Sequence, residues 1–155
     1  MFARTFPYFM PLKRMIPAVH QAVYRATNGR WSSKLAGQNM LLLTTKGRRT
    51  GVRRVVPLLY VPDGEAMIVI GSNWGGRRNP DWYWNVLADP HARVQAGPRK
   101  LRVEARIVGA DERPRVWSLV TAQYPGYEAY AQRLGGIREI PLVVLTPAGA
   151  ARHSV

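Results

Sequence analysis

The chain of 155 residues contains no cysteine and few acidic side chains. The absence of cysteine excludes a disulfide framework, a thiolate zinc site and a cysteine nucleophile. The 9 acidic residues face 23 lysines and arginines, which gives a formal charge of +14. Such a charge attracts polyanions, a class that includes nucleic acids, anionic lipids and small molecules carrying several phosphate or carboxylate groups.

Long hydrophobic runs are also absent from the sequence. No stretch approaches the roughly 18 consecutive apolar residues that a membrane-spanning helix requires. Residues 1–17 lack an uninterrupted hydrophobic region and a small-residue cleavage site, so we do not expect a signal peptide. The same residues mix aromatic side chains with cations, a composition that suits either an anionic membrane surface or a leader packed on the domain. We therefore expect a cytoplasmic protein, with or without peripheral contact at the inner face of the cell membrane.

Short hydrophobic segments separated by turns fill most of the chain, and its length fits a single domain over residues 1–155. The pattern predicts six strands over residues 39–45, 53–61, 66–71, 92–96, 100–108 and 140–146. It predicts helices over residues 17–27, 80–88 and 111–122, and a short one ending at residue 134. These elements indicate a small barrel of hairpins flanked by helices, with a leader over about residues 1–30 and a loose tail after Pro147.

The usual catalytic constellations do not occur in this sequence. The three histidines (His20, His91 and His153) lie far apart and show no ligand spacing, so we expect no metal site. The carboxylates fit turns, helix caps and solvated faces, and no phosphate-binding glycine motif is present. A chain without its own nucleophile or acid–base pair either binds a partner or takes its chemistry from a cofactor.

A basic loop follows the first predicted strand, with the sequence Lys-Gly-Arg-Arg-Thr-Gly over residues 46–51. Its glycines let the backbone approach an anion, and its guanidinium and hydroxyl groups match phosphate and carboxylate oxygens. The candidate ligands are Lys46, Arg48, Arg49, Thr50 and Arg54. A solvated hairpin tip is the alternative, but a tip needs only one or two charges, so we favour anion binding.

A second candidate segment begins where the third predicted strand ends. Residues 72–79 form a glycine-rich loop that leads to the start of the predicted helix, where backbone N–H groups are free for an anion or a ring carbonyl. Trp82 and Asn85 lie three residues apart and share a face of that helix. One could cover an aromatic ring while the other hydrogen-bonds its edge. Core packing is the alternative for the tryptophans, and we expect it for at least one of Trp74, Trp82 and Trp84.

Three tyrosines form a third candidate segment. Tyr127 and Tyr130 are one helical turn apart, and Tyr124 lies on the preceding turn. They could line a pocket for a planar substrate, with a hydroxyl as proton donor. Ordinary amphipathic packing is the alternative, which the spacing alone favours.

These segments, in this order, resemble the deazaflavin-dependent nitroreductase family, small actinobacterial oxidoreductases that use coenzyme F420. The similarity covers about residues 40–147. It rests on Gly47–Gly51, on Asn79–Asn85, on Tyr124–Tyr127 with Tyr130, and on Ile140–Leu145. The resemblance implies an α+β fold, the split β-barrel also used by flavin-mononucleotide oxidases, with about six mostly antiparallel strands flanked by helices.

The resemblance also implies an activity: hydride transfer from reduced F420 to a planar electron-poor acceptor, such as a quinone, a nitroaromatic compound or a conjugated carbonyl. F420 is a deazaflavin that carries a phosphate and an oligoglutamate tail. The implied cofactor-binding residues are Lys46, Arg48, Arg49, Thr50, Arg54, Val56, Pro57, Ser72, Asn73, Trp82 and Asn85. The implied substrate-binding residues are Leu59, Tyr124, Tyr127 and Tyr130, and the implied catalytic residues are Ser72, Tyr127 and Tyr130.

Three alternatives stay open from the sequence alone, and one of them is a membrane-surface adaptor that acts through residues 1–17. The same fold could use flavin mononucleotide instead of F420. A basic barrel could also grip single-stranded nucleic acid through arginine and aromatic side chains, although we do not expect a nucleic-acid partner. Both a monomer and a homodimer are compatible with the sequence.

Overall fold

The computed structural model describes residues 34–35 and 38–149. The predicted leader, its helix over residues 17–27 and most of the tail lie outside this part of the chain. The membrane contact expected for residues 1–17 lies outside it as well.

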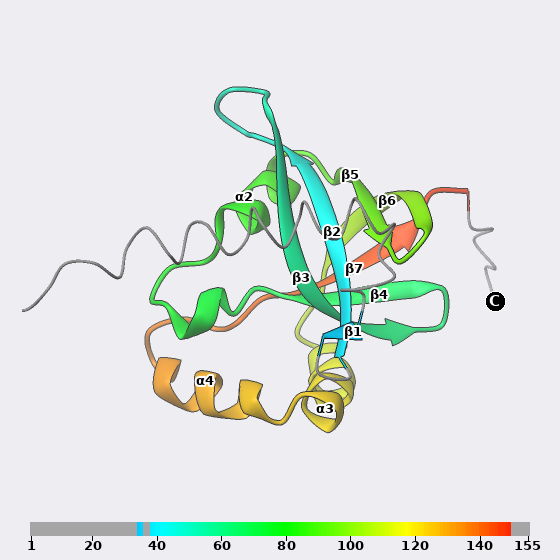
Figure 1. Ribbon diagram of the computed structural model, residues 1–155. Helices are drawn as coiled ribbons and strands as arrows, with labels where there is room; N and C mark the ends of the chain where they lie inside the picture. Colours follow the sequence, from blue (N-terminus) through cyan, green and yellow to red (C-terminus); the bar gives the residue numbers. More distant parts are fainter. Residues whose placement is uncertain (1–33, 36–37, 150–155) are drawn as a thin grey trace, which may run out of the picture.

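The described strands form one antiparallel sheet that closes into a barrel (Figure 1). They are β1 (Lys34–Leu35), β2 (Gln38–Lys46), β3 (Arg53–Asp63), β4 (Ala66–Ile70), β5 (His91–Ala96), β6 (Arg99–Ile107) and β7 (Leu142–Pro147). Their order is β1-β2-β3-β4-β7-β6-β5, and an additional pairing between β2 and β5 closes strands β2 to β7. The six predicted strands and the predicted split barrel are confirmed, and β1 is a short addition.

Helices occupy the connections between the later strands. They are the 3-10 helix η1 (Asn73–Gly75) and the α-helices α2 (Asp81–Ala88), α3 (Arg113–Gln123) and α4 (Gly126–Leu134). The three α-helices agree with the predicted helices. Among the described residues, no helix combines the length and the apolar character that crossing a bilayer would require.

Alternating side chains fill the barrel interior. On β2, Leu41 and Leu43 are fully buried, and Met67 and Val69 on β4 pack against the same cluster. This follows from strand geometry, in which every second side chain points to the same face. Trp82 of α2 belongs to this interior cluster.

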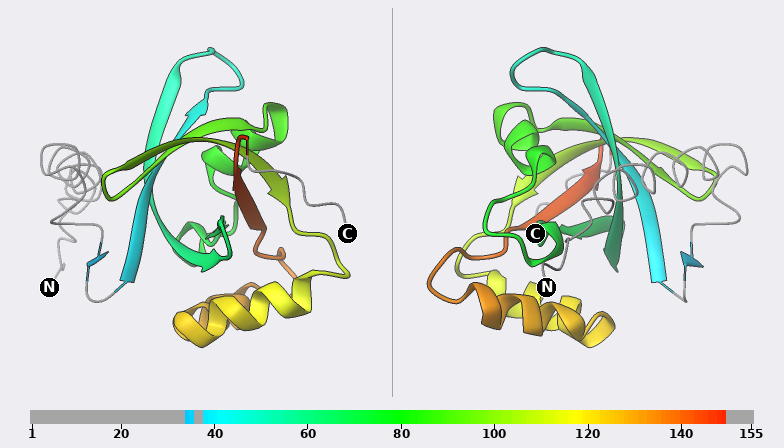
Figure 2. Two further views of the ribbon diagram at one scale, coloured as in Figure 1. Left: turned by 90° about the vertical axis from the view of Figure 1, so that its right-hand side faces the viewer. Right: turned by 60° about the vertical axis from the view of Figure 1, so that its left-hand side comes forward.

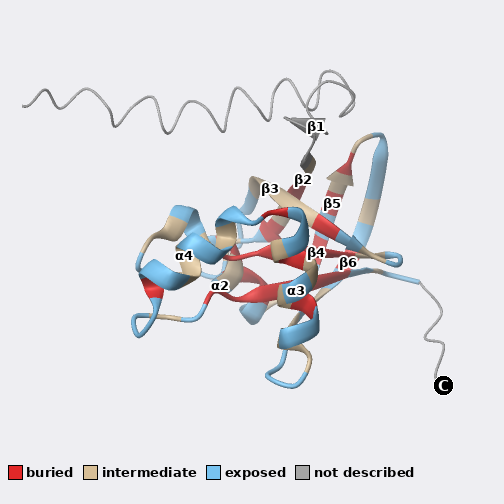
Figure 3. Ribbon diagram, turned by 90° about the horizontal axis from the view of Figure 1, so that it is seen from below, coloured by how far each residue is buried: buried red, intermediate tan, exposed pale blue. Residues whose placement is uncertain are grey.

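The opposite face of β3, β4 and β7 packs against α3 and α4 (Figure 2). Ile68 and Ile70 of β4 lie against Val116 and Val120 of α3 in a second buried cluster. Strand β4 is therefore buried on both faces, which explains why residues 67–70 are continuously apolar. The outward faces of α3 and α4 are exposed (Figure 3).

Candidate functional site

The turn between β2 and β3 is built by two glycines. The N–H of Gly47 donates to the carbonyl of Val52 at 2.8 Å, and the N–H of Gly51 donates to the carbonyl of Gly47 at 2.8 Å. A Cβ at Gly47 would lie 2.9 Å from the Val52 oxygen, and Gly51 has a φ of +71°. Both positions therefore favour glycine. The tight turn leaves Arg49 and Thr50 exposed at its tip.

Helix α2 holds this turn through Asn85. The Asn85 side-chain oxygen accepts from the Arg48 backbone N–H at 3.2 Å and from Arg48 Nη1 at 3.0 Å. Its amide Nδ2 donates to Thr45 Oγ1 at 3.0 Å, and Asn85 is only 4% exposed. Arg48 Nη2 also forms an ion pair with Asp81 at 3.3 Å. Arg48 and Asn85 thus join the basic turn to α2.

The strand geometry separates two residues of the predicted cofactor-binding set, Lys46 and Arg54. Lys46 pairs with Arg53, whereas Thr45 pairs with Arg54, so the two pairs lie on opposite faces of the hairpin. The same alternation applies along β3, where Val56 packs against the barrel interior. The structure therefore does not bring Lys46 together with Arg54 on one face.

Pro57 and Leu59 lie on the face of β3 opposite to Val56. Leu59 packs against the helical cluster that also contacts Tyr127 and Tyr130. Tyr124 belongs to the same cluster, so the structure brings all four implied substrate-binding side chains to the same side of the sheet.

The loop after β4 has an unusual backbone. Asn73 and Trp74 both have positive φ angles, +47° and +57°, which are uncommon for residues other than glycine. The Asn73 side-chain amide donates to the Arg78 carbonyl at 2.9 Å and closes the loop. Trp74 is 89% exposed, so its indole does not pack on the barrel.

Arg138 holds the same loop from the segment between α4 and β7. Its guanidinium donates to the carbonyl oxygens of Ser72 at 2.7 Å, Gly76 at 2.9 Å and Gly71 at 3.1 Å. It also donates to the side-chain oxygen of Asn79 at 2.7 Å. Burial lowers the pKa of Arg138, and the four oxygen acceptors replace the water that burial removes. One side chain therefore fixes both ends of the loop.

The three predicted tyrosines lie in a row. Ring centroids are 6.0 Å apart for Tyr124 and Tyr127, and 5.9 Å apart for Tyr127 and Tyr130. Tyr124 is 5% exposed; its hydroxyl accepts from the Asn39 N–H at 3.1 Å and donates to the Tyr60 carbonyl at 3.2 Å. The Tyr124 hydroxyl is therefore engaged with the backbone of β2 and β3.

Tyr127 has the strongest electrostatic perturbation of the three. Burial, with smaller contributions from Tyr124 and Tyr130, raises the pKa of Tyr127 to about 12. A hydrogen bond with the Ser72 side chain acts in the opposite direction. The phenol is thus protonated at neutral pH and lies next to Ser72, so two of the implied catalytic residues meet.

Tyr130 connects α4 to the loop after β4. A Cβ added at Gly75 would lie 2.8 Å from the Tyr130 ring, and Gly75 has a φ of +75°. The Arg133 guanidinium lies 5.0 Å from the centroid of the same ring. Glycine at position 75 therefore allows the loop backbone to approach the tyrosine row closely.

The tryptophans of this region have different environments. Trp82 is 6% exposed and packs in the barrel interior, which agrees with the expectation that at least one tryptophan serves the core. Trp84 is 43% exposed and makes an edge-to-face contact with Tyr83. Trp82 offers little surface to a ligand, and its side chain mainly anchors α2.

Contacts link these elements into one continuous surface: the β2–β3 turn contacts α2, the loop after β4 leads into α2, and Tyr130 packs on that loop. At one end it carries exposed cations, and at the other a partly buried phenol beside a serine. The described residues contain no group of side chains that could hold a metal ion. The arrangement can therefore bind an anion and donate a hydrogen bond to a carbonyl oxygen, but the described side chains carry no redox centre.

Arg138 is the main residue of this surface that the sequence analysis missed. In the sequence it lies between Ile137 and Glu139, outside the three candidate segments. Its role depends on four acceptors from residues 71–79, about 60 positions away. No local sequence signal identifies such a contact.

Comparison with known families gives a match over most of the chain. Residues 17–147 match a family model described as F420H(2)-dependent quinone reductase. An F420H(2)-dependent quinone reductase of Mycobacterium tuberculosis is 36% identical over 132 residues, which cover 83% of this chain and 87% of the relative.

Solved structures show the same fold. A structure described as an F420-H2 dependent reductase (FDR-A) has a TM-score of 0.62 at 34% identity, covering 68% of this chain and 92% of the other. A second structure, described as a domain-swapped dimer, has a TM-score of 0.66 at 28% identity, covering 87% and 98%.

Proposed function

The chain belongs to the F420H(2)-dependent quinone reductase family, and we propose that the surface joining the β2–β3 turn, the loop after β4 and α4 is its catalytic site. The protein is an F420-dependent oxidoreductase that reduces a quinone. Membership of this family favours F420 over flavin mononucleotide and an enzyme over a nucleic-acid-binding barrel.

The exposed side chains of the β2–β3 turn fit the charged part of F420. Arg49, Thr50 and Arg54 are exposed, and within the described residues neither arginine forms an ion pair. Guanidinium and hydroxyl groups are the donors that phosphate and carboxylate oxygens accept. Arg48 is already bonded to Asn85 and Asp81. We therefore assign Arg49, Thr50 and Arg54 to direct contact and Arg48 to positioning the turn.

The tyrosine end of the surface suits a planar ring system. Leu59, Tyr127 and Tyr130 supply apolar and aromatic surface on the same side of the sheet. Tilted and edge-to-face contacts, of the kind these tyrosines already make with one another, are favourable for aromatic partners. Ser72 and Asn73, at the end of β4, border this surface.

The bound cofactor supplies the hydride, so the chain itself needs no redox group. The side chains have to hold donor and acceptor in line and keep water away from them. Tyr127 is protonated at neutral pH and can donate a hydrogen bond to a quinone oxygen, and its pKa is raised to about 12. A phenol of high pKa keeps its proton until that oxygen becomes more basic during reduction. Ser72 orients the Tyr127 hydroxyl, and Tyr130 or water can supply a second proton.

The observation that carries this assignment is the contact between Ser72 and the partly buried phenol of Tyr127, from segments 55 positions apart. The test is anaerobic oxidation of reduced F420 by menadione. Tyr127→Phe is expected to lower kcat about tenfold or more with little change in the Kd for F420. If Tyr127→Phe reduces the quinone at the wild-type rate, the assignment of Tyr127 is wrong.

The anion end has a charge-matched test. Arg49→Gln with Arg54→Gln is expected to raise the Kd for F420 at least about tenfold, since hydrogen bonds to charged groups contribute about 1.5–3 kcal/mol each. Arg99→Gln with Lys100→Gln removes the same charge from the exposed start of β6 and is expected to change that Kd less than about threefold. Equal weakening in both double variants would mean that overall charge, and not this turn, binds the cofactor.

A further inference from the structure

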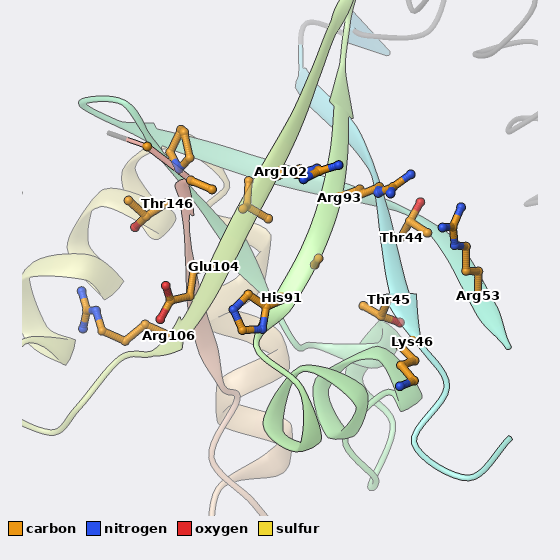
Figure 4. Close-up of a pocket in the computed structure, with 15 residues that line it drawn as sticks. Thr44, Thr45, Lys46, Arg53, His91, Arg93, Arg102, Glu104, Arg106 and Thr146 are labelled. Atoms are coloured by element: carbon orange, nitrogen blue, oxygen red, sulfur yellow. The ribbon is translucent and has the colours of Figure 1, made fainter. Parts of the chain in front are cut away.

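A basic pocket lies on the outer face of the barrel, formed by β2, the start of β3, β5, β6 and β7 (Figure 4). Its volume is about 890 Å³. The charged and imidazole side chains that line it are Lys46, Arg53, His91, Arg93, Arg102, Arg106 and a single carboxylate, Glu104. Of the residues assigned above to direct contact with F420, none lines this pocket.

The strand register explains why these cations gather. Thr44 lies opposite Arg93, and Arg93 lies opposite Arg102, so the three form one row across β2, β5 and β6. Lys46 follows Thr44 on the same face of β2, about 7 Å further along the strand, and lies opposite Arg53. Two cation pairs, Arg93–Arg102 and Lys46–Arg53, therefore border one pocket.

Placing like charges directly opposite each other destabilises a sheet. Arg106, at the edge of the pocket, is neutralised by Glu112 at 2.7 Å. In contrast, the described residues provide no ion pair to Arg93, Arg102, Lys46 or Arg53. An anion bound between the two pairs would remove this repulsion.

We propose that this pocket is a second ligand site, which binds the diphosphate group of a nucleoside diphosphate. Guanidinium forks and the Thr44 hydroxyl match phosphoryl oxygens. Two cation pairs suit two phosphoryl groups better than one. Glu104 lies opposite Thr146, at the side of the pocket away from Lys46 and Arg53, and can accept hydrogen bonds from the hydroxyl or amino groups of a nucleoside.

Other anionic partners fit the pocket less well. Single-stranded nucleic acid binds on aromatic platforms, and apart from His91 no aromatic side chain lines this pocket. Surfaces that lie on membranes present exposed apolar side chains, which a concave polar pocket does not. A second copy of the chain would bring another strongly positive surface against it.

The pocket lies apart from the tyrosine end of the proposed catalytic site. Arg93 and Arg102 lie outside the barrel wall formed by β5 and β6, whereas Tyr127 packs in the helical cluster beside β3, β4 and β7. Figure 4 shows Arg93 and Arg102 beside each other, with Thr44 and Arg53 on the β2–β3 side. The barrel interior separates the Arg93–Arg102 pair from Tyr127. Lys46 and Arg53 belong to the same hairpin as Arg49 and Arg54, and strand alternation places them on the opposite face from Arg54.

The proposal is tested by calorimetric titration of the full-length protein with ADP, AMP and inorganic pyrophosphate. ADP and pyrophosphate are expected to bind with a Kd below about 1 mM, and AMP at least about tenfold more weakly than ADP. Arg93→Gln with Arg102→Gln is expected to weaken ADP binding at least about tenfold. The same variant is expected to bind F420 with the wild-type Kd.

Two charge-matched variants serve as controls. Arg99→Gln with Lys100→Gln, outside the pocket lining, is expected to change ADP affinity less than about threefold. Arg49→Gln with Arg54→Gln is expected to weaken F420 but not ADP. The proposal is overturned if ADP does not bind, if saturating F420 displaces it, or if the Arg99/Lys100 variant weakens it as much as the Arg93/Arg102 variant. None of these results depends on whether quinone reduction occurs.

Discussion

Asn85 accepts two hydrogen bonds from Arg48, one from the backbone N–H at 3.2 Å and one from the guanidinium Nη1 at 3.0 Å. The same side chain donates to Thr45 at 3.0 Å. The buried amide of Asn85 thus joins the start of the basic loop to α2, a helix that begins more than thirty residues later in the sequence. Together with the Arg48–Asp81 ion pair, this side chain fixes the position of the loop relative to α2.

Asn85→Ala is expected to lower the free energy of unfolding by about 1–3 kcal/mol, because it leaves the hydroxyl of Thr45, which is 3% exposed, without its partner. The measurement is urea unfolding followed by circular dichroism. The Kd for F420 is expected to rise as well, since Arg48 loses its hydrogen bonds to Asn85 and keeps only those to Asp81.

A second substitution isolates the cause of that loss. Thr45→Val removes the orphaned hydroxyl while keeping the branched shape, so adding it to Asn85→Ala is expected to cost nothing further or to restore part of the stability. A double variant in which the two losses simply add would show that the Thr45 hydroxyl is not the source of the destabilisation.

Arg138 provides the second prediction. Arg138→Lys keeps the charge but cannot reach the carbonyls of Ser72 and Gly76 and the Asn79 side chain with one ammonium group. Amide hydrogen exchange within residues 72–79 is expected to accelerate at least about tenfold relative to wild type, while the barrel strands stay protected.

Arg133→Gln is the matched control for Arg138→Lys. Arg133 lies over the Tyr130 ring and donates none of the loop hydrogen bonds described above. Exchange within residues 72–79 is therefore expected to stay within about threefold of wild type in this variant. Equal acceleration in both variants would assign the rigidity of the loop to the cation–ring contact and not to Arg138.

The strands could be predicted because their physical signal is local. Leu41 and Leu43 alternate with neighbours on the other face, and the turn glycines at 47 and 51 mark where β2 ends. Helix α2 could be predicted from Pro80 and the Asp89-Pro90 stop. These signals need no knowledge of the rest of the chain.

The roles of individual side chains could be predicted only in part. Trp74 and Trp82 look alike in the sequence, yet one is 89% and the other 6% exposed, because the helix turns only Trp82 toward the barrel interior. The Arg93–Arg102 pair was missed because it arises from the pairing register of β5 and β6, which local patterns do not specify.

The two tryptophans supply a third prediction. Trp74→Gly removes an exposed side chain and relieves a left-handed backbone conformation, a gain partly offset by the extra flexibility of glycine in the unfolded chain. The free energy of unfolding is expected to be unchanged or to rise by up to about 1 kcal/mol.

Trp82→Ala is the contrasting variant, since it leaves a cavity in the barrel interior. We expect a loss of about 3–5 kcal/mol in the free energy of unfolding. Similar losses in Trp74→Gly and Trp82→Ala would contradict the assignment of the two indoles to solvent and to core.

The last prediction concerns the ionisation of Tyr127. Burial raises its pKa from the ordinary value of 10.0 to about 12, so between these values the folded chain holds a proton that the unfolded chain releases. The contribution of Tyr127 to stability is therefore fully present below pH 10 and is lost as the pH rises toward 12.

The measurement is an alkaline titration of tyrosinate absorbance, taken as the difference between wild type and Tyr127→Phe. A midpoint near 12 in that difference is expected; a midpoint near 10 would show that the phenol is solvated and that burial does not raise its pKa. Tyr83→Phe is a suitable control, because it removes one phenol from α2 and leaves Tyr124, Tyr127 and Tyr130 unchanged.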